Sequence, residues 1–305
     1  MADLHVWFTF SWATITWLIK TQVTNGWCGK PSPGSVADCS QAEGPVVAEP
    51  KFFRVIACEI ALREICFLAA QSRSLLDLEF LPQGLHDRPK EGLQQVQQRI
   101  DAVQPGRYDA ILVGYGLCGN LIAGLQARHT PLVIPRAHDC ITFFLGSKQR
   151  HQHLFRVQGG SYYYTAGWLE VLRRRGGSQA PAGPSGFLPA PAGLGGSRDE
   201  VYAQWVNKYG EEKARYLAEV MGAWAGHYTH AVLIQFDFTR HLNLTAQVQA
   251  ICAQRGWQFQ EIQGDLGLLR RWLDGQWDPA DFLVVQPGQR VVPSYTDSII
   301  AAEGP

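Results

Sequence analysis

Five residues of this sequence carry side chains that bind transition metals and lie just beyond short apolar runs. They are Cys58, His86, Cys118, His138 and Cys140. Cysteine thiolates and histidine imidazoles bind zinc, and thiolates also hold iron–sulfur clusters. No C-x-x-C pair occurs among them, so their spacing does not by itself define a metal motif. A zinc or iron–sulfur site therefore requires a fold that brings distant residues together.

His138 and Glu59 are the candidate catalytic acid–base groups of such a site. The imidazole of His138 suits proton transfer as well as metal binding, and the neighbouring Asp139 carboxylate is placed to orient it or to pair with Arg136. Glu59 follows Cys58 directly. Its carboxylate suits a general base, but a carboxylate at a helix N-terminus is also stabilised by the helix dipole. The sequence supports both roles for Glu59.

A glycine motif competes for the same place. It has the form G-x-G-x-x-G, directly follows an apolar run, and is made by Gly114, Gly116 and Gly119. Asp139 stands 20 residues after the last glycine, which is typical of a dinucleotide-binding fingerprint. Gly114, Gly116, Gly119 and Asn120 are therefore candidate cofactor-binding residues. Alternatively, the glycines permit a tight turn that points Cys118 and Asn120 into a crevice.

The elements that would position these residues follow from the alternation of short apolar runs with longer amphipathic segments, which predicts a parallel α/β sheet. Strands are predicted at Phe52–Cys58, Leu76–Leu81, Tyr108–Gly114, Pro131–Pro135, Ala231–Phe236, Trp257–Ile262 and Phe282–Val285. Helices are predicted at Glu59–Ala70, from about Lys90, at Leu121–Arg128, Glu200–Val206, Glu211–Ala223 and Leu242–Arg255. The predicted fold class is α/β, with a Rossmann-like parallel sheet flanked by helices, as one large sheet or as two stacked α/β halves.

Cys58 ends a predicted strand of the first half, and the other four metal-binding candidates follow predicted strands of that half. In an open parallel sheet every strand points the same way, and ligands bind beyond the carboxyl ends. We therefore expect the five residues to converge at one edge of the sheet as a thiol-rich crevice. Cysteine is also among the most buried residue types, so Cys66 and Cys252 are expected in the core. The remaining histidines, including His151, are expected to be surface or structural residues.

The chain divides by composition into four segments. Residues 1–50 form an apolar and Gly/Pro-rich extension, 51–175 an N-terminal α/β half with the Cys/His site, 176–199 a low-complexity Gly/Pro/Ala linker or insertion, and 200–305 a C-terminal α/β half. The apolar run Val6–Ile19 is shorter than the roughly 20 residues of a spanning helix. It also lacks the basic residues that precede the apolar stretch of a secretory signal. No membrane span is expected.

Charge and cysteine usage restrict the partners. The 27 basic residues balance the 27 acidic ones, which removes the positive surface that nucleic acid binding requires. Seven cysteines, an odd number spread over a chain of 305 residues, do not form the pattern of a secreted disulfide framework. We expect a cytoplasmic protein with reduced thiols and a small-molecule partner.

Several stretches together resemble a known family. They are VIACEI, LPQGLHDRP, YDAILVGYGLCGN, PLVIPRAHDCITFFLGSKQRH, YYYTAGWLE and DFLVVQPG. They resemble domain of unknown function 1638 from about Phe52 to Gly288, apart from the low-complexity segment, and the resemblance selects the same five metal-binding candidates. It implies no established reaction. It does imply an association with corrinoid-dependent methyl transfer, hence a metal-dependent transferase or an accessory protein of one-carbon metabolism with a corrinoid-system partner. The chain departs from the family pattern after Asp237, where a glycine is expected.

Overall fold

The computed structural model describes residues 49–174, 206–207, 210–215, 228–294 and 296–304. The predicted linker at 176–199, Cys28, Cys39 and nearly all of the predicted N-terminal extension lie outside the described residues, as does most of the two helices predicted between residues 200 and 223. The chain from Glu49 onward forms one compact unit. Among the described residues, no helix has the length and apolarity needed to cross a bilayer.

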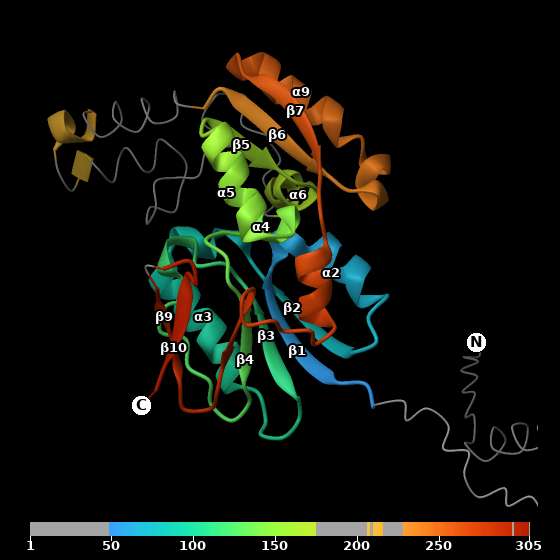
Figure 1. Cartoon of the computed structure of the whole chain (residues 1–305). Coiled ribbons are helices and arrows are strands. Elements are labelled where there is room, and N and C mark those ends of the chain that lie inside the picture. Colours follow the sequence, from blue (N-terminus) through green and yellow to red (C-terminus); the bar gives the residue numbers. More distant parts are fainter. Residues whose placement is uncertain (1–48, 175–205, 208–209, 216–227, 295, 305) are drawn as a thin grey trace, which may run out of the picture. The chain divides into compact units, whose positions relative to one another are not determined.

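A five-stranded, mostly parallel sheet forms the centre of this unit (Figure 1). Its strands are β1 (Phe52–Cys58), β2 (Leu75–Leu81), β3 (Ala110–Gly114), β4 (Leu132–Pro135) and β8 (Phe282–Val285). The order is β2-β1-β3-β4-β8, and only β8 is antiparallel to its neighbour. The residues of β3 and β4 are all buried, because helices cover both faces of the sheet. The prediction of a Rossmann-like parallel sheet is confirmed.

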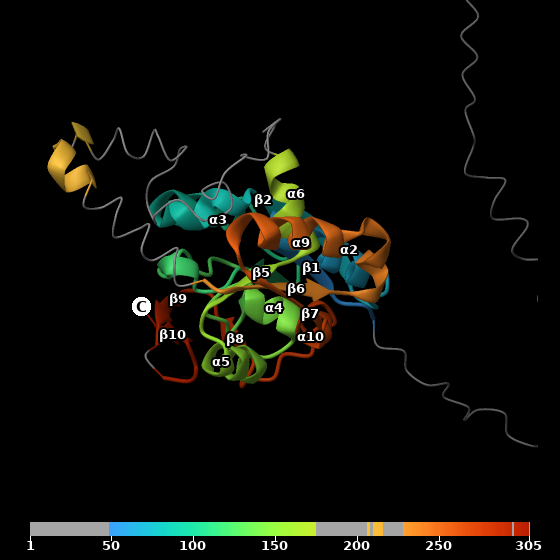
Figure 2. The ribbon, with the colours of Figure 1, turned by 90° about the horizontal axis from the view of Figure 1, so that it is seen from above.

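A second parallel sheet contains β5 (Ser161–Tyr164), β6 (His230–Gln235) and β7 (Gln258–Gln263) in that order. Helix α9 (Leu244–Arg255) packs on β6 and β7 and encloses a small core with them (Figure 2). Cys252 is buried in that core, as predicted. The two sheets interleave along the chain, since β5 precedes residue 176 and β8 returns to the first sheet.

Short helices and one hairpin complete the unit. They are η1 (Glu59–Ala61), α2 (Leu62–Ala69), η2 (Gln83–Asp87), α3 (Pro89–Asp101), η3 (Cys118–Asn120), α4 (Ile141–Leu145), α5 (Lys148–Val157), α6 (Ala166–Arg174), η4 (Asp237–Leu242), α10 (Gly267–Leu273), β9 (Arg290–Pro293) and β10 (Ile300–Glu303). Helix α2 turns Ile65 and Leu68 inward. This phase leaves Cys66 exposed, so the prediction that Cys66 lies in the core is wrong.

The helix predicted at Leu121–Arg128 is also wrong, because this segment consists of turns. Part of its backbone bonds to the strand β9, and within the segment the N–H of Leu125 donates to the carbonyl of Ile122 in a turn. The N–H of Gly124 donates to the carbonyl of Val291 at 2.8 Å, and the N–H of Val291 donates to the carbonyl of Leu125 at 2.8 Å. Gly124 has a φ of +99°, a conformation outside the right-handed helix. Backbone N–H and C=O groups that a helix would bond internally are therefore bonded to a strand that is distant in the sequence.

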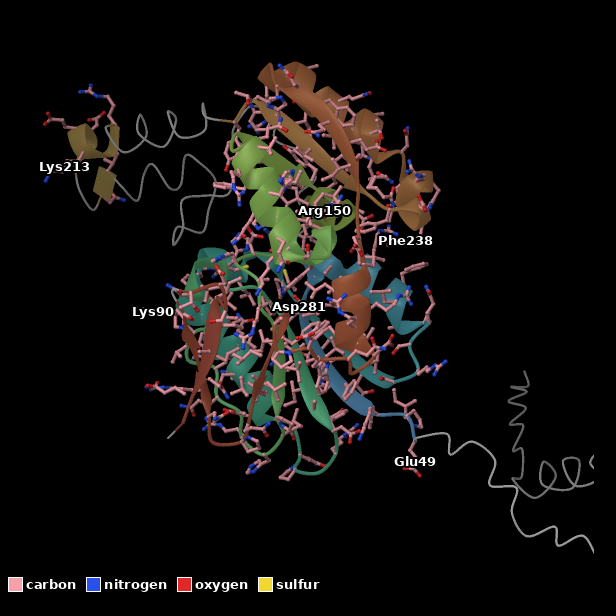
Figure 3. The ribbon with its side chains drawn as sticks, viewed as in Figure 1. Glu49, Lys90, Arg150, Lys213, Phe238 and Asp281 are labelled. Atoms are coloured by element: carbon pink, nitrogen blue, oxygen red, sulfur yellow. The ribbon has the colours of Figure 1, made fainter. Side chains whose placement is uncertain are left out.

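The second sheet and its helices pack against the carboxyl ends of the first sheet. Ile234 and Phe236, at the end of β6, belong to the same core as β1, β3 and β4. Gly167 at the start of α6 packs so closely on η1 that a Cβ atom there would lie 1.8 Å from the carbonyl oxygen of Ile60. Arg150 of α5, labelled in Figure 3, donates to the carbonyl of Leu145 at 3.3 Å and to that of Gln263 at 2.6 Å.

Candidate functional site

Cys58 and Tyr115 leave adjacent strands at the same level. In the parallel pairing of β1 with β3, Ala57 is the partner of Gly114, and the next residues are Cys58 and Tyr115. The strands are in tight contact here, because a Cβ atom at Gly114 would lie 2.6 Å from the Cβ of Ala57. Glycine at position 114 is thus required by packing within the sheet.

The loops after β3 and β4 run against each other and bring Cys118 to Cys140. The N–H of Leu117 donates to the carbonyl of Ala137, and that of Cys118 to the carbonyl of His138, each at 2.8 Å. A Cβ atom at Gly116 would lie 2.8 Å from the Cα of Asp139, so only glycine permits this approach.

The three thiols of Cys58, Cys118 and Cys140 lie within electrostatic range of one another and of Asp139. Burial raises the pKa of the Cys118 thiol to about 12, with smaller contributions from Asp139 and Cys58. Burial, followed by Cys118, Asp139 and Cys58, raises the pKa of the Cys140 thiol well above its usual range. The backbone N–H groups of Cys140 and Gly116 hydrogen-bond to the Cys118 sulfur and oppose part of this effect.

These pKa directions bear on the chemistry of the thiols. Nucleophilic and redox-active cysteines have lowered pKa values, usually through nearby positive charge. Here burial and a neighbouring carboxylate hold the Cys118 and Cys140 thiols in the protonated form at neutral pH. The arrangement therefore does not favour a thiol nucleophile. A bound cation would supply the missing positive charge and release the protons.

His86 is placed beside the loop that carries Cys118. Its backbone carbonyl oxygen lies 3.8 Å from where a Cβ atom at Gly119 would be. Its ring Nδ1 lies 2.7 Å from the carbonyl of Gln83, which can only accept, so Nδ1 carries the proton and Nε2 is the basic nitrogen. Metal-binding histidines commonly have their second nitrogen held in this way.

His138 and Glu59, the two candidate acid–base groups, differ in their surroundings. The His138 side chain is exposed, and its backbone carbonyl is what meets Cys118. Glu59 lies in the first turn of η1, where its Oε1 accepts a hydrogen bond from the N–H of Gln83 at 2.9 Å. Glu59 thereby connects the segment after Cys58 to the segment that carries His86.

Three groups at the site were not selected from the sequence. His151 of α5 has its Nε2 3.7 Å from Oδ2 of Asp139, and its side chain is only 15% exposed. Nothing in the sequence links these two residues. Burial, followed by Asp139, raises the pKa of the hydroxyl of Tyr163 on β5, so Tyr163 is electrostatically coupled to Asp139. Tyr115 could have been found, since it directly follows a predicted strand.

Two sequence-based expectations gain no geometric support. Among the residues that the structure describes, no three His, Cys, Asp or Glu side chains are arranged to hold one metal ion. The glycine motif leads into the short η3 and then turns, whereas a dinucleotide fingerprint leads into an α-helix whose N-terminus faces the phosphates. Asp237, where the family pattern is broken, is 83% exposed and pairs with Arg240.

Comparison with known proteins gives one match. The family model described as "Protein of unknown function (DUF1638)" matches residues 80–273, which is more than half of the chain. The matched region contains His86, Cys118, His138 and Cys140, and Cys58 precedes it. No curated protein and no solved structure matches the chain.

Proposed function

The chain belongs to the DUF1638 family of proteins of unknown function, and we propose that Cys58, Cys118 and Cys140 bind an iron–sulfur cluster. The observation that carries this proposal is the convergence of three thiols from three separate strand ends, each within electrostatic range of the others. Cysteine thiolates are the usual ligands of such clusters. The cluster would lie at the carboxyl edge of a parallel sheet, where ligands of this fold class bind.

A single zinc ion is the alternative cofactor. Zinc holds each thiolate at about 2.3 Å, so three ligand sulfurs lie within about 4 Å of one another. A cluster distributes its thiolates over several iron atoms and therefore tolerates wider separations. Among the described residues, no three His, Cys, Asp or Glu side chains are grouped so that they could hold a metal ion, so binding of either cofactor would require side chains at the site to move.

His86 is the proposed fourth ligand. Its Nδ1–H is held by the Gln83 carbonyl, which directs the basic Nε2 away from that carbonyl. Its segment lies against Gly119, next to Cys118. His138, the alternative, has an exposed side chain. On this proposal a metal-dependent transferase or a one-carbon accessory protein is the expected class, and a corrinoid-system partner and a cytoplasmic location stay predictions.

Anaerobic purification followed by iron, sulfide and zinc analysis tests this proposal. We expect iron and sulfide in equal amounts and broad visible absorption. Cys118→Ala and Cys140→Ala should lower iron content at least about tenfold, since the loss of even a hydrogen-bond partner of a ligand typically costs about 10–100-fold in metal affinity. Cys66→Ala and Cys252→Ala are matched controls, since Cys66 is exposed and Cys252 belongs to the other core. His86→Ala should lower iron content and His138→Ala should not.

Three results would contradict the proposal. Stoichiometric zinc without sulfide would replace the cluster by a single ion. Absence of any bound metal would exclude both. Equal iron content in the Cys118→Ala and Cys66→Ala variants would move the cofactor away from these thiols. A nucleotide-binding role for Gly114–Asn120 stays a prediction, which a thermal-shift panel of nucleotides checks.

A further inference from the structure

Glu64 on α2 carries a carboxyl group that is buried away from solvent. The residue is 0% exposed, and neither of its side-chain oxygens has a hydrogen-bond partner among the described residues. Native proteins rarely leave buried polar groups unpaired, and a buried charge without a partner is more costly still. The native packing therefore suits a protonated, neutral carboxyl at this position and resists an ionised one.

Arg63 and Glu170 are the charged side chains that act on this carboxyl, and they form an ion pair with each other. Burial has the largest effect and raises the pKa of Glu64 to about 7, the backbone N–H of Glu64 and then Arg63 lower it, and Glu170 raises it further. Nη2 and Nε of Arg63 lie 2.6 Å and 2.8 Å from Oε1 of Glu170 on α6. An ionised Glu64 would thus repel Glu170 and compete with it for Arg63.

The other helices that pack on α2 are α10 and η1. The charged side chains of these two helices and of the α10 C-cap have partners elsewhere: Arg270 with Gln71, Arg271 with Asp281, Asp274 with Ser72, and Glu59 with the N–H of Gln83. The charges that act on Glu64 from the described residues are therefore those that join α2 to α6.

The start of α6 is held by packing, whereas the next turn carries the ion pair. A Cβ atom at Gly167 would lie 1.8 Å from the carbonyl oxygen of Ile60 in η1, so the backbones are in contact there. Glu170 and Val171 follow one turn later, and Val171 is only 4% exposed. Val171 therefore reports whether this turn of α6 stays packed.

We propose that Glu64 makes the packing of α6 on α2 sensitive to pH, so that release of its proton admits water and moves α6 away from α2. The proton passes to solvent. The new carboxylate must then be hydrated, because neither oxygen has a described partner, and it repels Glu170. Since the carboxyl pKa is raised in the folded protein, the packed arrangement is fully favoured below pH 4.5 and is lost as the pH rises through about 7. This switch needs no bound cofactor.

The test follows the valine methyl resonances of the native, full-length protein by NMR between about pH 5.5 and about pH 8.5. Val171→Ile assigns the Val171 resonance. We expect this resonance to shift with a midpoint near pH 7, and the resonance of Val113, which is fully buried in β3, to stay constant. Glu64→Gln should abolish the shift of Val171.

Two further variants test the electrostatic origin of the midpoint. Glu170→Gln removes a like charge and should lower the midpoint, whereas Arg63→Ala removes a cation and should raise it. Glu261→Gln, on β7 and paired with Arg240, is the matched control and should leave the midpoint unchanged. These variants keep the test decisive if Glu64→Gln folds poorly.

Four results would overturn the proposal. The first is a Val171 resonance that stays constant over this pH range. The second is a shift that persists in Glu64→Gln, because another group would then be titrating. The third is an equal midpoint in Glu170→Gln and Glu261→Gln. The fourth is a shift of Val113 in parallel with Val171, because the whole fold and not the contact of α6 would then respond to pH.

Discussion

The two parallel sheets end in chemically different edges. The strands of the first sheet run into Cys58, Tyr115 and the Cys118 loop, which together form a buried set of titratable groups. The second sheet ends in packing contacts. Phe236 follows β6 and lies so close to Gly264 that a Cβ atom there would be 2.2 Å from its ring. The first sheet therefore has titratable groups at its carboxyl edge, whereas the second sheet, which is also parallel, has apolar packing contacts there.

This difference shows what the strand-end rule does and does not say. The rule places a ligand site at the carboxyl edge of a parallel sheet, and both sheets have such an edge. Residue type distinguishes the two edges, since cysteine thiols are able to bind metals whereas a phenyl ring can only pack. The second sheet is still coupled to the first edge through Tyr163, whose hydroxyl pKa is raised by burial and then by Asp139.

The largest effect is expected where the two edges meet, at Gly167. Gly167→Ala would place a Cβ atom 1.8 Å from the carbonyl oxygen of Ile60, just after Cys58. Because the neighbour is backbone, α6 must move, and we expect a loss of about 3 kcal/mol or more in the free energy of unfolding. Urea titration measures this loss. Gly159→Ala is the control, because its nearest neighbour would lie at 3.5 Å.

If Gly167→Ala and Gly159→Ala unfold at the same urea concentration, the close packing of α6 on η1 is not a feature of the folded protein. If Gly167→Ala is unstable but binds as much iron as the unmodified protein, the second sheet is not needed to support the thiol edge.

The next largest effect is a pH dependence of the free energy of unfolding, which we expect from Glu64 on α2. Its side chain is fully buried, and burial raises the pKa of the carboxyl from 4.5 to about 7. A raised carboxyl pKa means that the native state holds its proton longer than the unfolded state. This contribution to stability is therefore full below pH 4.5 and is lost as the pH rises through about 7.

The difference between the two pKa values corresponds to about 3 kcal/mol. Urea titrations at several pH values should show that Glu64→Gln removes a loss of this size between pH 4.5 and pH 8. An unchanged pH dependence in Glu64→Gln would mean that the carboxyl titrates normally and is hydrated in the native state.

The smallest effect is expected from the ion pair that joins α2 to α6. Nη2 of Arg63 lies 2.6 Å from Oε1 of Glu170, and both side chains are partly exposed. Solvent screens such pairs, so a double-mutant cycle with Arg63→Ala and Glu170→Ala should give a coupling energy of about 0.5–1 kcal/mol that weakens in salt. A coupling above about 2 kcal/mol would show that this pair, and not apolar packing, holds the second layer in place.

The order of the elements could be predicted from the sequence in most places. The bounds of β1 and β8 agree with prediction, because both are short apolar runs with clear ends. β5 was not predicted, since the run of tyrosines after Ser161 has neither alternation nor aliphatic residues. The predicted helix at Leu121–Arg128 failed because pairing with β9 is a contact between residues more than 160 positions apart.

The sequence selected the cysteines of the candidate site but not the residues around them. The strand-end rule selected Cys58, Cys118 and Cys140, and burial together with the Cys118 and Cys58 thiols raises the pKa of Cys140; that the three bind one cofactor stays a prediction. The same rule selected His138, whose side chain is exposed. It could not select His151, which reaches Asp139 only because α5 packs beside the loop after β4.

The sequence by itself determined which residue types stand at the end of each strand and, because parallel strands share one direction, that these residues lie toward the same edge of the sheet. Only the tertiary structure decided which way each side chain points after its strand. That direction depends on loop dihedrals, such as the φ of +37° at Cys118, and on contacts with distant segments, such as the approach of Asp139 to Gly116. Such conformations are set by packing across the molecule and not by the residues nearby in the chain.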